Sequence, residues 1–401
     1  MHNLTKIKLF RIAAWISFPF ACIFVYPFVL LKKKKNTRLF FFFDRYAIGG
    51  AQRVHLDILH AVADTPKQVY FTRKSLNDSL KQEFYSVPNT ESSDVHFWCD
   101  NLLFRLFSVH YFAFYVNRHK GAHAFSSNST FFYDVLPFFA KHVHTTELLH
   151  NFTYGKKGME FFGLANYKYL ATRIVIDGFT LSNIKKQYEQ YGISQYMERV
   201  LLIEPGVDIP PYRKTSFGLP LKVLYAGRGG PQKRVHLINE VAEYCIEKKL
   251  PVEFHFAGTM MDELSQTVRD HAVLHGQISG QQRMYELYQL CNAIILTSAY
   301  EGFPMIIKEG MACGCIPVVT ALPGNKTHLR NGVNSMLIEA VEDERMVVKL
   351  AIDQITSLIS DKGLVERLSR ACYEYAALHF GKEKFIEAYR RLLLPARFNG
   401  S

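Results

Sequence analysis

The sequence predicts an α/β protein with two domains, each built on a parallel sheet, preceded by a basic apolar segment suited to a membrane. Its 401 residues are enough for two domains of ordinary size. From Leu39 onward, short apolar runs rich in β-branched and aromatic residues alternate with amphipathic helical patterns. This alternation is typical of parallel sheets covered by helices on both faces.

Positive charge is concentrated at the N-terminus. The chain has a net charge of +12, but residues 1–38 hold eight Lys and Arg residues and no acidic residue, so the remainder carries only +4. This distribution argues against a nucleic-acid-binding surface on the main body.

The seven cysteines are scattered and odd in number, with no C-x-x-C pair and no histidine at zinc-ligand spacing. We therefore expect a reducing compartment and no zinc site. Independently of the cysteines, no bound cofactor is expected.

The N-terminal segment contains twenty uncharged residues, from Ile12 to Leu31, which as a helix would span about 30 Å, the thickness of a hydrocarbon core. A cleaved signal peptide and a buried soluble helix are alternatives. No small-residue cleavage site follows, and Pro19 and Pro27 disfavour a soluble helix. We expect a membrane helix, either spanning or lying on the surface. The basic residues beyond Leu31 favour a cytoplasmic body.

The first domain opens with an apolar strand from Leu39 to Phe43, followed by a loop ending in Gly49 and Gly50 and then an amphipathic helix. The two glycines would allow a ligand to approach the backbone at the helix N-terminus, although glycines in turns are more often structural. The aromatic stretch from Leu102 to Phe139 is expected to be mostly core, with an exposed lipid-facing surface as the alternative.

Three histidines surround the strand predicted over 143–149. His142 and His144 share one face, whereas His150 follows the strand's C-terminal end. This alternating placement argues against a metal site. Open α/β sheets bind ligands beyond the carboxyl ends of their strands, so His150 is the functional candidate, with a structural hydrogen-bonding histidine as the alternative.

The second domain begins with a strand from Leu221 to Ala226 and a glycine-rich loop. Gly227 and Gly229 match the first positions of a dinucleotide-binding fingerprint, but Gln232 occupies the third glycine position. The loop therefore does not match the dinucleotide-binding fingerprint, which disfavours an NAD site. Arg228 and Lys233 instead place two cations on this loop, as a diphosphate site would require.

The most informative stretch runs from Thr297 to Thr320. An apolar strand precedes it, Glu301-Gly-Phe-Pro304 forms an elbow, and a short helix with Pro304 as its first residue leads to a second strand. The elbow would aim helix N-H groups at an anion. Taking the eight residues from Glu301 to Glu309 as helical, the two carboxylates would lie about 12 Å apart. Solvent-facing carboxylates are the plain alternative.

Glu301-Gly-Phe-Pro304, Glu309, Met311-Ala-Cys-Gly314 and Pro317-Val-Val319 together resemble the E-x7-E signature of retaining GT-B glycosyltransferases, specifically glycosyltransferase family 4. The resemblance covers roughly residues 40–395 and is strongest over 222–338. It implies a GT-B fold of two Rossmann-like domains with a nucleotide-sugar in the cleft. The implied catalytic residues are Arg228, Lys233, Glu301 and His150. The implied donor-binding residues are Gly49, Gly50, Gly227, His275, Gly302, Phe303, Pro304, Met305 and Glu309.

The implied activity is retaining transfer of a hexose from a nucleotide-sugar, with a UDP-sugar as the expected donor, to a membrane glycan or lipid-linked acceptor in cell-envelope polysaccharide synthesis. Metal is not expected, because the sequence contains no D-x-D. In this interpretation Glu309 holds the ribose, Glu301 a sugar hydroxyl and His150 another sugar group. The alternatives are a sugar-nucleotide epimerase or phosphorylase on the same fold and a non-catalytic membrane scaffold.

With the resemblance, the chain divides into five predicted segments. A membrane anchor precedes an acceptor domain, a linker, a nucleotide-sugar domain and a final helix that crosses back to the first domain. Their ranges are 1–37, 38–208, 209–220, 221–378 and 379–401.

Overall fold

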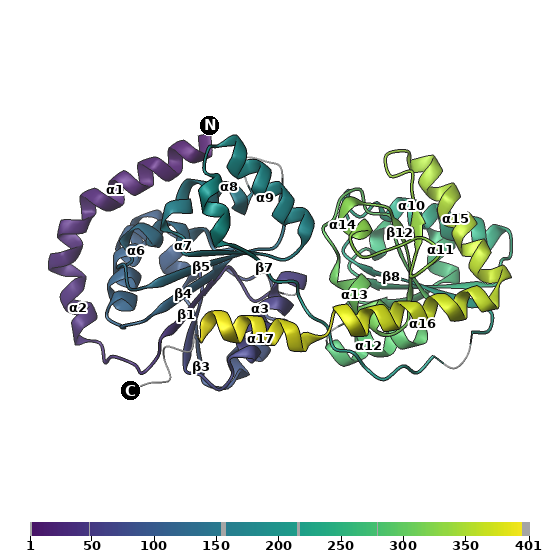
Figure 1. Cartoon of the computed structure of the whole chain (residues 1–401), viewed down its shortest axis with the longest axis horizontal. Coiled ribbons are helices and arrows are strands. Elements are labelled where there is room, and N and C mark those ends of the chain that lie inside the picture. The colour runs from purple at the N-terminus through teal and green to yellow at the C-terminus, as the bar shows by residue number, and fades with distance from the viewer. Residues whose placement is uncertain (1, 48, 154–157, 215–216, 279, 395–401) are drawn as a thin grey trace. The chain divides into compact units, whose positions relative to one another are not determined.

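A computed structural model describes residues 2–47, 49–153, 158–214, 217–278 and 280–394, with the backbone alone for 2–6 and 103. Its fold consists of two compact α/β units (Figure 1). The first unit contains the chain up to Glu204 and from Phe385 onward, and the second contains Pro205–Lys384. Each unit is described by itself below.

The first unit is built on a seven-stranded parallel sheet with the order β3-β2-β1-β4-β5-β6-β7. The central strands are buried along their whole length, as expected for a sheet covered on both faces. The strands are β1 (Leu39–Phe43), β2 (Lys67–Phe71), β3 (Thr90–Asp94), β4 (His123–Ser127), β5 (His144–Leu149), β6 (Thr172–Val175) and β7 (Val200–Leu202).

Alternate β1 side chains enter two cores on opposite faces of this sheet. Phe40 and Phe42 pack with α6 and α7, whereas Phe41 and Phe43 pack with α3 and α17 (Figure 1). The helices are α3 (Gly50–Ala61), α4 (Lys81–Ser86), α5 (His96–Asp100), α6 (Leu102–Asn117), α7 (Thr130–Val135), α8 (Met159–Asn166), α9 (Gly178–Gln190) and α17 (Lys382–Leu393). Three 3-10 helices join them, η1 (Leu136–Phe138), η2 (Tyr167–Tyr169) and η3 (Ser194–Arg199).

The N-terminal segment forms two helices, α1 (His2–Phe24) and α2 (Tyr26–Leu31). Pro19 lies inside α1 without ending it, and the break comes at Val25, where Pro27 begins the next helix. Within the described residues, the stretch Ile7–Phe24 is the one helical span long and apolar enough to cross a membrane. Both helices pack against the first unit, chiefly on α6.

The second unit contains a six-stranded parallel sheet with the order β10-β9-β8-β11-β12-β13. The chain leaves β8 toward β9 on one side and later returns to pair β11 on the other. The carboxyl ends of β8 and β11 therefore flank a topological switch point, where open α/β sheets bind ligands. The strands are β8 (Leu221–Gly227), β9 (Val252–Gly258), β10 (Val273–Gly276), β11 (Ala293–Leu296), β12 (Ile316–Thr320) and β13 (Met336–Ile338).

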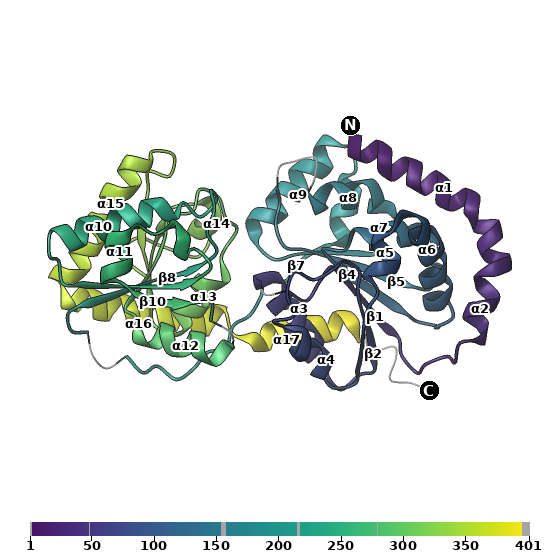
Figure 2. The same ribbon diagram turned by 180° about the vertical axis from the view of Figure 1, so that it is seen from behind.

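Helices cover both faces of this sheet, with α10 and α11 on one side and α12, α13 and α16 on the other (Figure 2). They enclose one continuous apolar core. The helices are α10 (Val235–Glu247), η4 (Met261–Glu263), α11 (Gln266–His271), α12 (Gln281–Leu290), α13 (Met305–Ala312), α14 (Pro323–Lys326), α15 (Glu344–Ser360) and α16 (Lys362–His379). The predicted two-sheet parallel α/β architecture is confirmed.

Candidate functional site at the carboxyl edge of the second sheet

The loop after β8 begins the candidate site, and its backbone is tightly constrained. Gly227 accepts a hydrogen bond from the Thr259 N-H at 3.3 Å. Gly258 has φ +128°, and a Cβ there would lie 1.8 Å from the Gly227 oxygen. Tyr225, at the end of β8, donates its hydroxyl to the Arg228 carbonyl oxygen at 2.7 Å. Because these contacts use the backbone, the Arg228 side chain is left exposed to solvent.

Lys233 and Glu301, two of the predicted site residues, meet directly. The Lys233 ammonium contacts Glu301 Oε1, and the Ser298 hydroxyl donates to the same oxygen at 3.2 Å. The lysine and glutamate side chains are only 17% and 14% exposed. A cation from the β8 loop and a carboxylate from the β11 loop are thus held together at the switch point.

Arg234, which the sequence does not single out, joins these two loops. It is the residue that caps the N-terminus of α10, with φ +46°, and it is buried. Its guanidinium donates to the carbonyl oxygens of Thr297 at 2.7 Å, Ser298 at 3.2 Å and Val341 at 2.9 Å. Arg234 therefore fixes the separation of the β8 and β11 loops, and with it the position of Lys233.

The elbow differs from the prediction in where its helix begins. Pro304 has an extended backbone, with φ −60° and ψ 138°, and caps α13 instead of forming its first residue. Of the stretch from Glu301 to Glu309, only Met305 to Glu309 is helical, so the all-helical geometry from which the 12 Å was estimated is not the one observed. Phe303 is buried, with its ring 4.6 Å from that of His328 and 5.5 Å from that of Phe380. Its side chain is therefore committed to the core.

Gly324, at the start of α14, packs closely against the backbone of Gly302 in the elbow. A Cβ there would lie 2.0 Å from the Gly302 carbonyl oxygen and 2.5 Å from its carbonyl carbon. These are backbone atoms, so the elbow itself would have to move. Gly324→Ala is therefore expected to weaken binding of UDP, the nucleotide expected from the sequence, by about tenfold, the equivalent of about 1.4 kcal/mol, measured by calorimetry. Gly178→Ala, where a Cβ meets nothing within 4 Å, is the matched control. Unchanged UDP affinity in Gly324→Ala would show that the elbow does not contact the nucleotide.

Glu309 receives a hydrogen bond from Tyr288 of α12, whose hydroxyl lies 2.8 Å from Oε2. Burial, reinforced by the Glu309 charge, raises the pKa of Tyr288 well above its usual value, so the phenol keeps its proton and donates. In the sequence, Met284, Leu287, Tyr288 and Cys291 recur at helical spacing, and this pattern predicts a stripe that belongs to the core and not to a site. Tyr288 is indeed buried, but it also positions a predicted site residue. A buried tyrosine normally finds a partner for its hydroxyl, and that signal could have identified it.

His275, at the end of β10, is the last member of a short hydrogen-bonded chain. Its Nε2 lies 3.0 Å from Nδ1 of His255, whose own Nε2 lies 2.7 Å from Glu253 Oε1. Burial lowers the pKa of both histidines. A carboxylate only accepts, so neutral His255 donates through Nε2 and accepts from the Nε2-H of His275. The hydrogen bonds therefore leave His275 Nδ1 as an acceptor.

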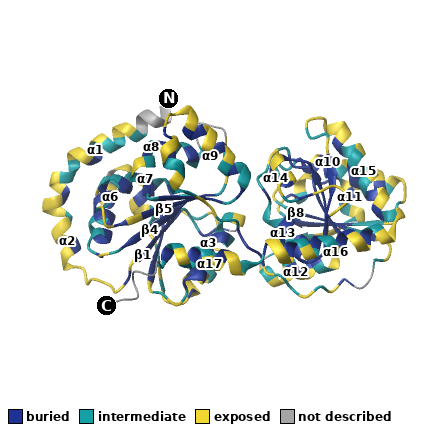
Figure 3. Cartoon of the chain, viewed as in Figure 1, coloured by how far each residue is buried: buried dark blue, intermediate teal, exposed yellow. Residues whose placement is uncertain are grey.

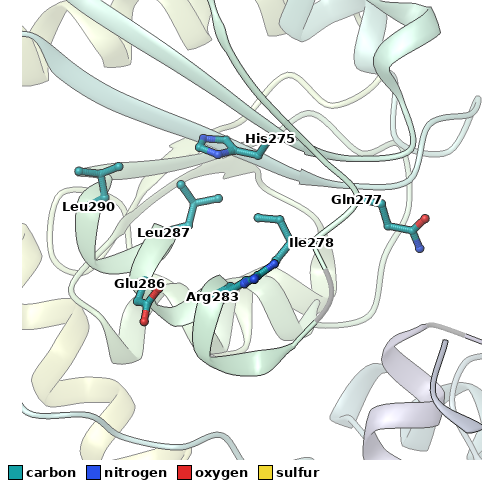
Figure 4. A pocket seen from close by; sticks show the side chains of 7 residues that line it. All are labelled: His275, Gln277, Ile278, Arg283, Glu286, Leu287 and Leu290. Atoms are coloured by element: carbon teal, nitrogen blue, oxygen red, sulfur yellow. The ribbon is translucent and has the colours of Figure 1, made fainter. Parts of the chain in front are cut away.

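A cavity of about 370 Å³ lies beside His275. Figure 4 shows α12 side chains below the imidazole and the residues after β10 beside it. The wall combines apolar surface with one cation and one carboxylate. Its residues are His275, Gln277, Ile278, Arg283, Glu286, Leu287 and Leu290.

In the first unit, His150 contacts His55 of α3, with 3.1 Å between their Nε2 atoms. His55 is fully buried and stacks on Phe43, with a centroid distance of 4.2 Å. Burial lowers the pKa of His150 to about 4 and that of His55 well below its usual value. Both rings are therefore neutral at pH 7, one donating and the other accepting.

This pair predicts a pH dependence of stability. The unfolded chain binds a proton at His150 below about pH 6.5, whereas the folded chain does so only near pH 4. Stability should therefore fall as the pH falls through this window, by about 3 kcal/mol for His150 alone. Urea denaturation at pH 7 and pH 4.5 measures the effect. His150→Gln should reduce this slope, while His60→Gln, at an exposed position of α3, should not. Equal slopes in all three proteins would contradict the assignment.

Gly49 and Gly50 lie at the start of α3. A Cβ at Gly50 would meet nothing within 4 Å, and one at Gly49 would meet only the end of the Gln52 side chain. Neither glycine is required by packing, so their predicted role in ligand approach stays a prediction.

No group of three metal-ligating side chains comes together among the residues that the structure describes. His142 lies 3.1 Å from the Asn117 carbonyl oxygen, and His144 lies 3.0 Å from the Thr172 hydroxyl.

Comparison with known proteins connects the second unit to one family. Residues 213–377 match the family model of Glycosyl transferases group 1. The matched stretch lies within the second unit and spans the Lys233–Glu301 pair and the Tyr288–Glu309 contact.

Curated relatives share part of their length with the chain. D-inositol 3-phosphate glycosyltransferase of Xylanimonas cellulosilytica is 26% identical over 219 residues, covering 48% of this chain and 50% of the relative. UDP-Gal:alpha-D-GlcNAc-diphosphoundecaprenol alpha-1,3-galactosyltransferase of Escherichia coli is 24% identical over 144 residues, 33% of this chain and 37% of the relative. The chain spans about half the length of the first of these relatives.

Solved structures match over both units. TarM superimposes with a TM-score of 0.71 at 14% identity, covering 90% of this chain and 100% of that one. HepE of Anabaena in complex with UDP gives a TM-score of 0.69 at 16% identity, with 89% and 99% coverage. At such low identity these likenesses establish the fold, which is of the GT-B type.

Proposed function

We propose that the chain is a glycosyltransferase that moves a sugar from a UDP-sugar to a glycan or lipid-linked acceptor. The observation that carries the proposal is the Lys233–Glu301 contact beside exposed Arg228, at the switch point of the sheet whose sequence matches the Glycosyl transferases group 1 model. Cations there suit a diphosphate, and a carboxylate suits sugar hydroxyls. The UDP complex of HepE supports the choice of nucleotide for this fold.

In the proposed mechanism, Arg228 and Lys233 stabilise the leaving diphosphate. Departure of the sugar concentrates negative charge on the β-phosphate, and preorganised cations lower the barrier most where charge develops. Lys233 is held by Glu301 before any donor arrives, so little reorganisation is needed. Transfer would be retaining and independent of metal. The departing diphosphate would accept the proton of the incoming hydroxyl.

Glu309 would hold the ribose hydroxyls, oriented by Tyr288. Glu309→Ala should raise the donor KM about tenfold or more, because a charged hydrogen-bond acceptor is worth about 1.5–3 kcal/mol. Tyr288→Phe should raise the KM less, since it keeps the carboxylate and removes only its orienting donor. Steady-state kinetics with varied UDP-sugar test both. An unchanged KM in Glu309→Ala would refute the ribose assignment.

The nucleobase would lie against the backbone that follows β10, beside the His275 cavity. His150 lies in the first unit, and its proposed contact with the transferred sugar stays a prediction. His150→Ala tests it through kcat.

The acceptor is proposed to be a membrane-associated glycan in cell-envelope polysaccharide synthesis, handled on the cytoplasmic side. The printed name of the Escherichia coli relative specifies a diphosphoundecaprenol-linked acceptor, and the N-terminal segment of this chain is apolar and basic.

Incubation with a panel of UDP-sugars and GDP-sugars and a lipid-linked acceptor tests the proposed function. We expect nucleotide release and a glycosylated product from UDP donors, with the donor's anomeric configuration kept in the NMR spectrum and no effect of EDTA. An epimerised nucleotide-sugar or a sugar phosphate would instead assign the fold to the alternative chemistries. Failure to bind any donor would favour a non-catalytic scaffold.

A further inference from the structure

Helix α1 is docked lengthwise on the first unit by specific contacts. Ala14 and Ala21 are buried against it. Arg11 donates to Asn166 Oδ1 at 2.6 Å, and the Ser17 hydroxyl lies 2.9 Å from Nε2 of buried His110. These contacts fix one face of α1, and that face covers α6.

The opposite face of α1 and α2 is apolar and exposed along its length. Exposed residues recur along both helices in Figure 3. A helix on the surface of a soluble protein normally turns charged and polar residues outward. Here the outward residues are 49–86% exposed, and they are Leu9, Ile12, Ile16, Phe20, Ile23, Phe24, Phe28, Leu30 and Leu31.

A second exposed apolar cluster lies beside the beginning of α1. The Arg105 guanidinium of α6 is 5.7 Å from the Phe10 ring centroid of α1, which places the two helices side by side. Around it, side chains of α5 and α6 that are 38–67% exposed continue the apolar surface, namely Phe97, Trp98, Leu102, Phe104 and Phe107. Apolar patches of this extent mark interaction sites.

Unpaired cations border this surface. Lys33 and Lys34, just after α2, and Lys8 on α1 are exposed, and no ion pair is found for them among the described residues. No acidic residue occurs within residues 1–38. Apolar side chains flanked by lysines match the acyl and headgroup layers of an anionic lipid surface. A protein partner would not require that the charged residues bordering the surface all be positive.

We propose that α1 and α2 lie in the plane of an anionic bilayer surface, with their outward face in the acyl boundary, and do not span it. Spanning would break the Arg11–Asn166 and Ser17–His110 contacts and carry Arg11 into hydrocarbon. It would also uncover α6, whose sixteen residues include one charged side chain, Arg105. The proposal rests on contacts in the first unit and is independent of the proposed transferase activity.

The two tryptophans of the chain provide the test, because both lie on this surface and are about half exposed, Trp15 at 48% and Trp98 at 51%. Trp15 lies near the middle of Ile7–Phe24. If Ile7–Phe24 were the spanning stretch, Trp15 would lie at the bilayer centre, whereas an in-plane helix keeps it near the glycerol layer. Full-length Trp98→Phe protein is reconstituted in phosphatidylcholine–phosphatidylglycerol vesicles with lipids brominated at different depths.

We expect bromine near the glycerol end of the acyl chain to quench Trp15 more strongly than bromine near the methyl end. The reverse order would show a spanning helix and overturn the proposal.

Vesicle flotation supplies a second measurement. Ile16→Glu and Phe20→Glu should each reduce the vesicle-bound fraction at least tenfold, and replacing phosphatidylglycerol with phosphatidylcholine should weaken binding. The matched control is Leu378→Glu, at an equally exposed apolar position (66%) of α16 in the second unit, which should leave binding unchanged. Because these side chains are exposed, unchanged circular dichroism is expected.

Equal binding by all variants would overturn the proposal. So would a dimer in vesicle-free buffer that dissociates on Ile16→Glu, since the face would then be an interface between copies.

Discussion

Replacing Lys233 by alanine is expected to lower kcat with a UDP-sugar donor by about 100- to 1000-fold, the loss typical of removing one preorganised electrostatic group from a transition state. The ammonium is held by Glu301 and mostly shielded from water, so solvent cations cannot easily take its place. Its removal also leaves the Glu301 carboxylate uncompensated beside the proposed diphosphate, which adds repulsion. Initial rates of nucleotide release under saturating donor measure the effect.

Lys222→Ala is the matched control for this variant. Lys222 lies on β8 in the same unit and pairs with Glu253 at 3.7 Å, but it is near the start of the strand, away from the carboxyl edge. Its loss should change kcat less than twofold. If Lys233→Ala keeps the wild-type kcat while its melting temperature is unchanged, the ammonium does not act on the leaving group.

Replacing Arg234 by alanine is expected to destabilise the second unit by about 3 kcal/mol or more. Three carbonyl oxygens, of Thr297, Ser298 and Val341, would lose a charged donor inside the protein, and hydrogen bonds to charged groups contribute about 1.5–3 kcal/mol each before relaxation. Arg234→Lys should recover only part of the loss, because an ammonium cannot reproduce the guanidinium fork. Urea denaturation measures both variants.

Arg234→Ala should also weaken UDP binding, because the β8 loop would no longer be hydrogen-bonded to the β11 loop through the guanidinium. Arg345→Ala, at an exposed arginine of α15, is the control and should stay within about 0.5 kcal/mol of the wild type. An Arg234→Ala protein as stable as this control would contradict the structural role of Arg234.

The fold could be predicted where its strands are fully buried. β1, β11 and β12 are nearly continuous apolar runs because both faces of a parallel sheet are covered. β3 was not predicted, because its sequence, Thr-Glu-Ser-Ser-Asp, is polar throughout, and the strand lies half exposed at the edge of the sheet. β13 has only three residues, too few for a periodic signal.

The candidate site could be predicted where residue type and spacing carry the chemistry, as for Lys233 and Glu301, which the structure brings into contact. The role of Arg234 could not be predicted, because an arginine that follows a lysine in a loop is normally a solvent-exposed cation. Its burial follows from a left-handed backbone conformation and from carbonyl groups more than sixty residues away. Tyr288 was assigned to the core by its helical spacing, which gives the face of a side chain but not the partner of its hydroxyl.

Calorimetric titration of the full chain with UDP and with uridine most directly tests whether the switch point of the second sheet binds a diphosphate. UDP is expected to bind at least about 100-fold more tightly than uridine, equivalent to about 2.7 kcal/mol from the phosphates, and Arg228→Ala with Lys233→Ala should abolish most of that difference. Equal affinities for UDP and uridine, or a difference that survives both substitutions, would contradict the account.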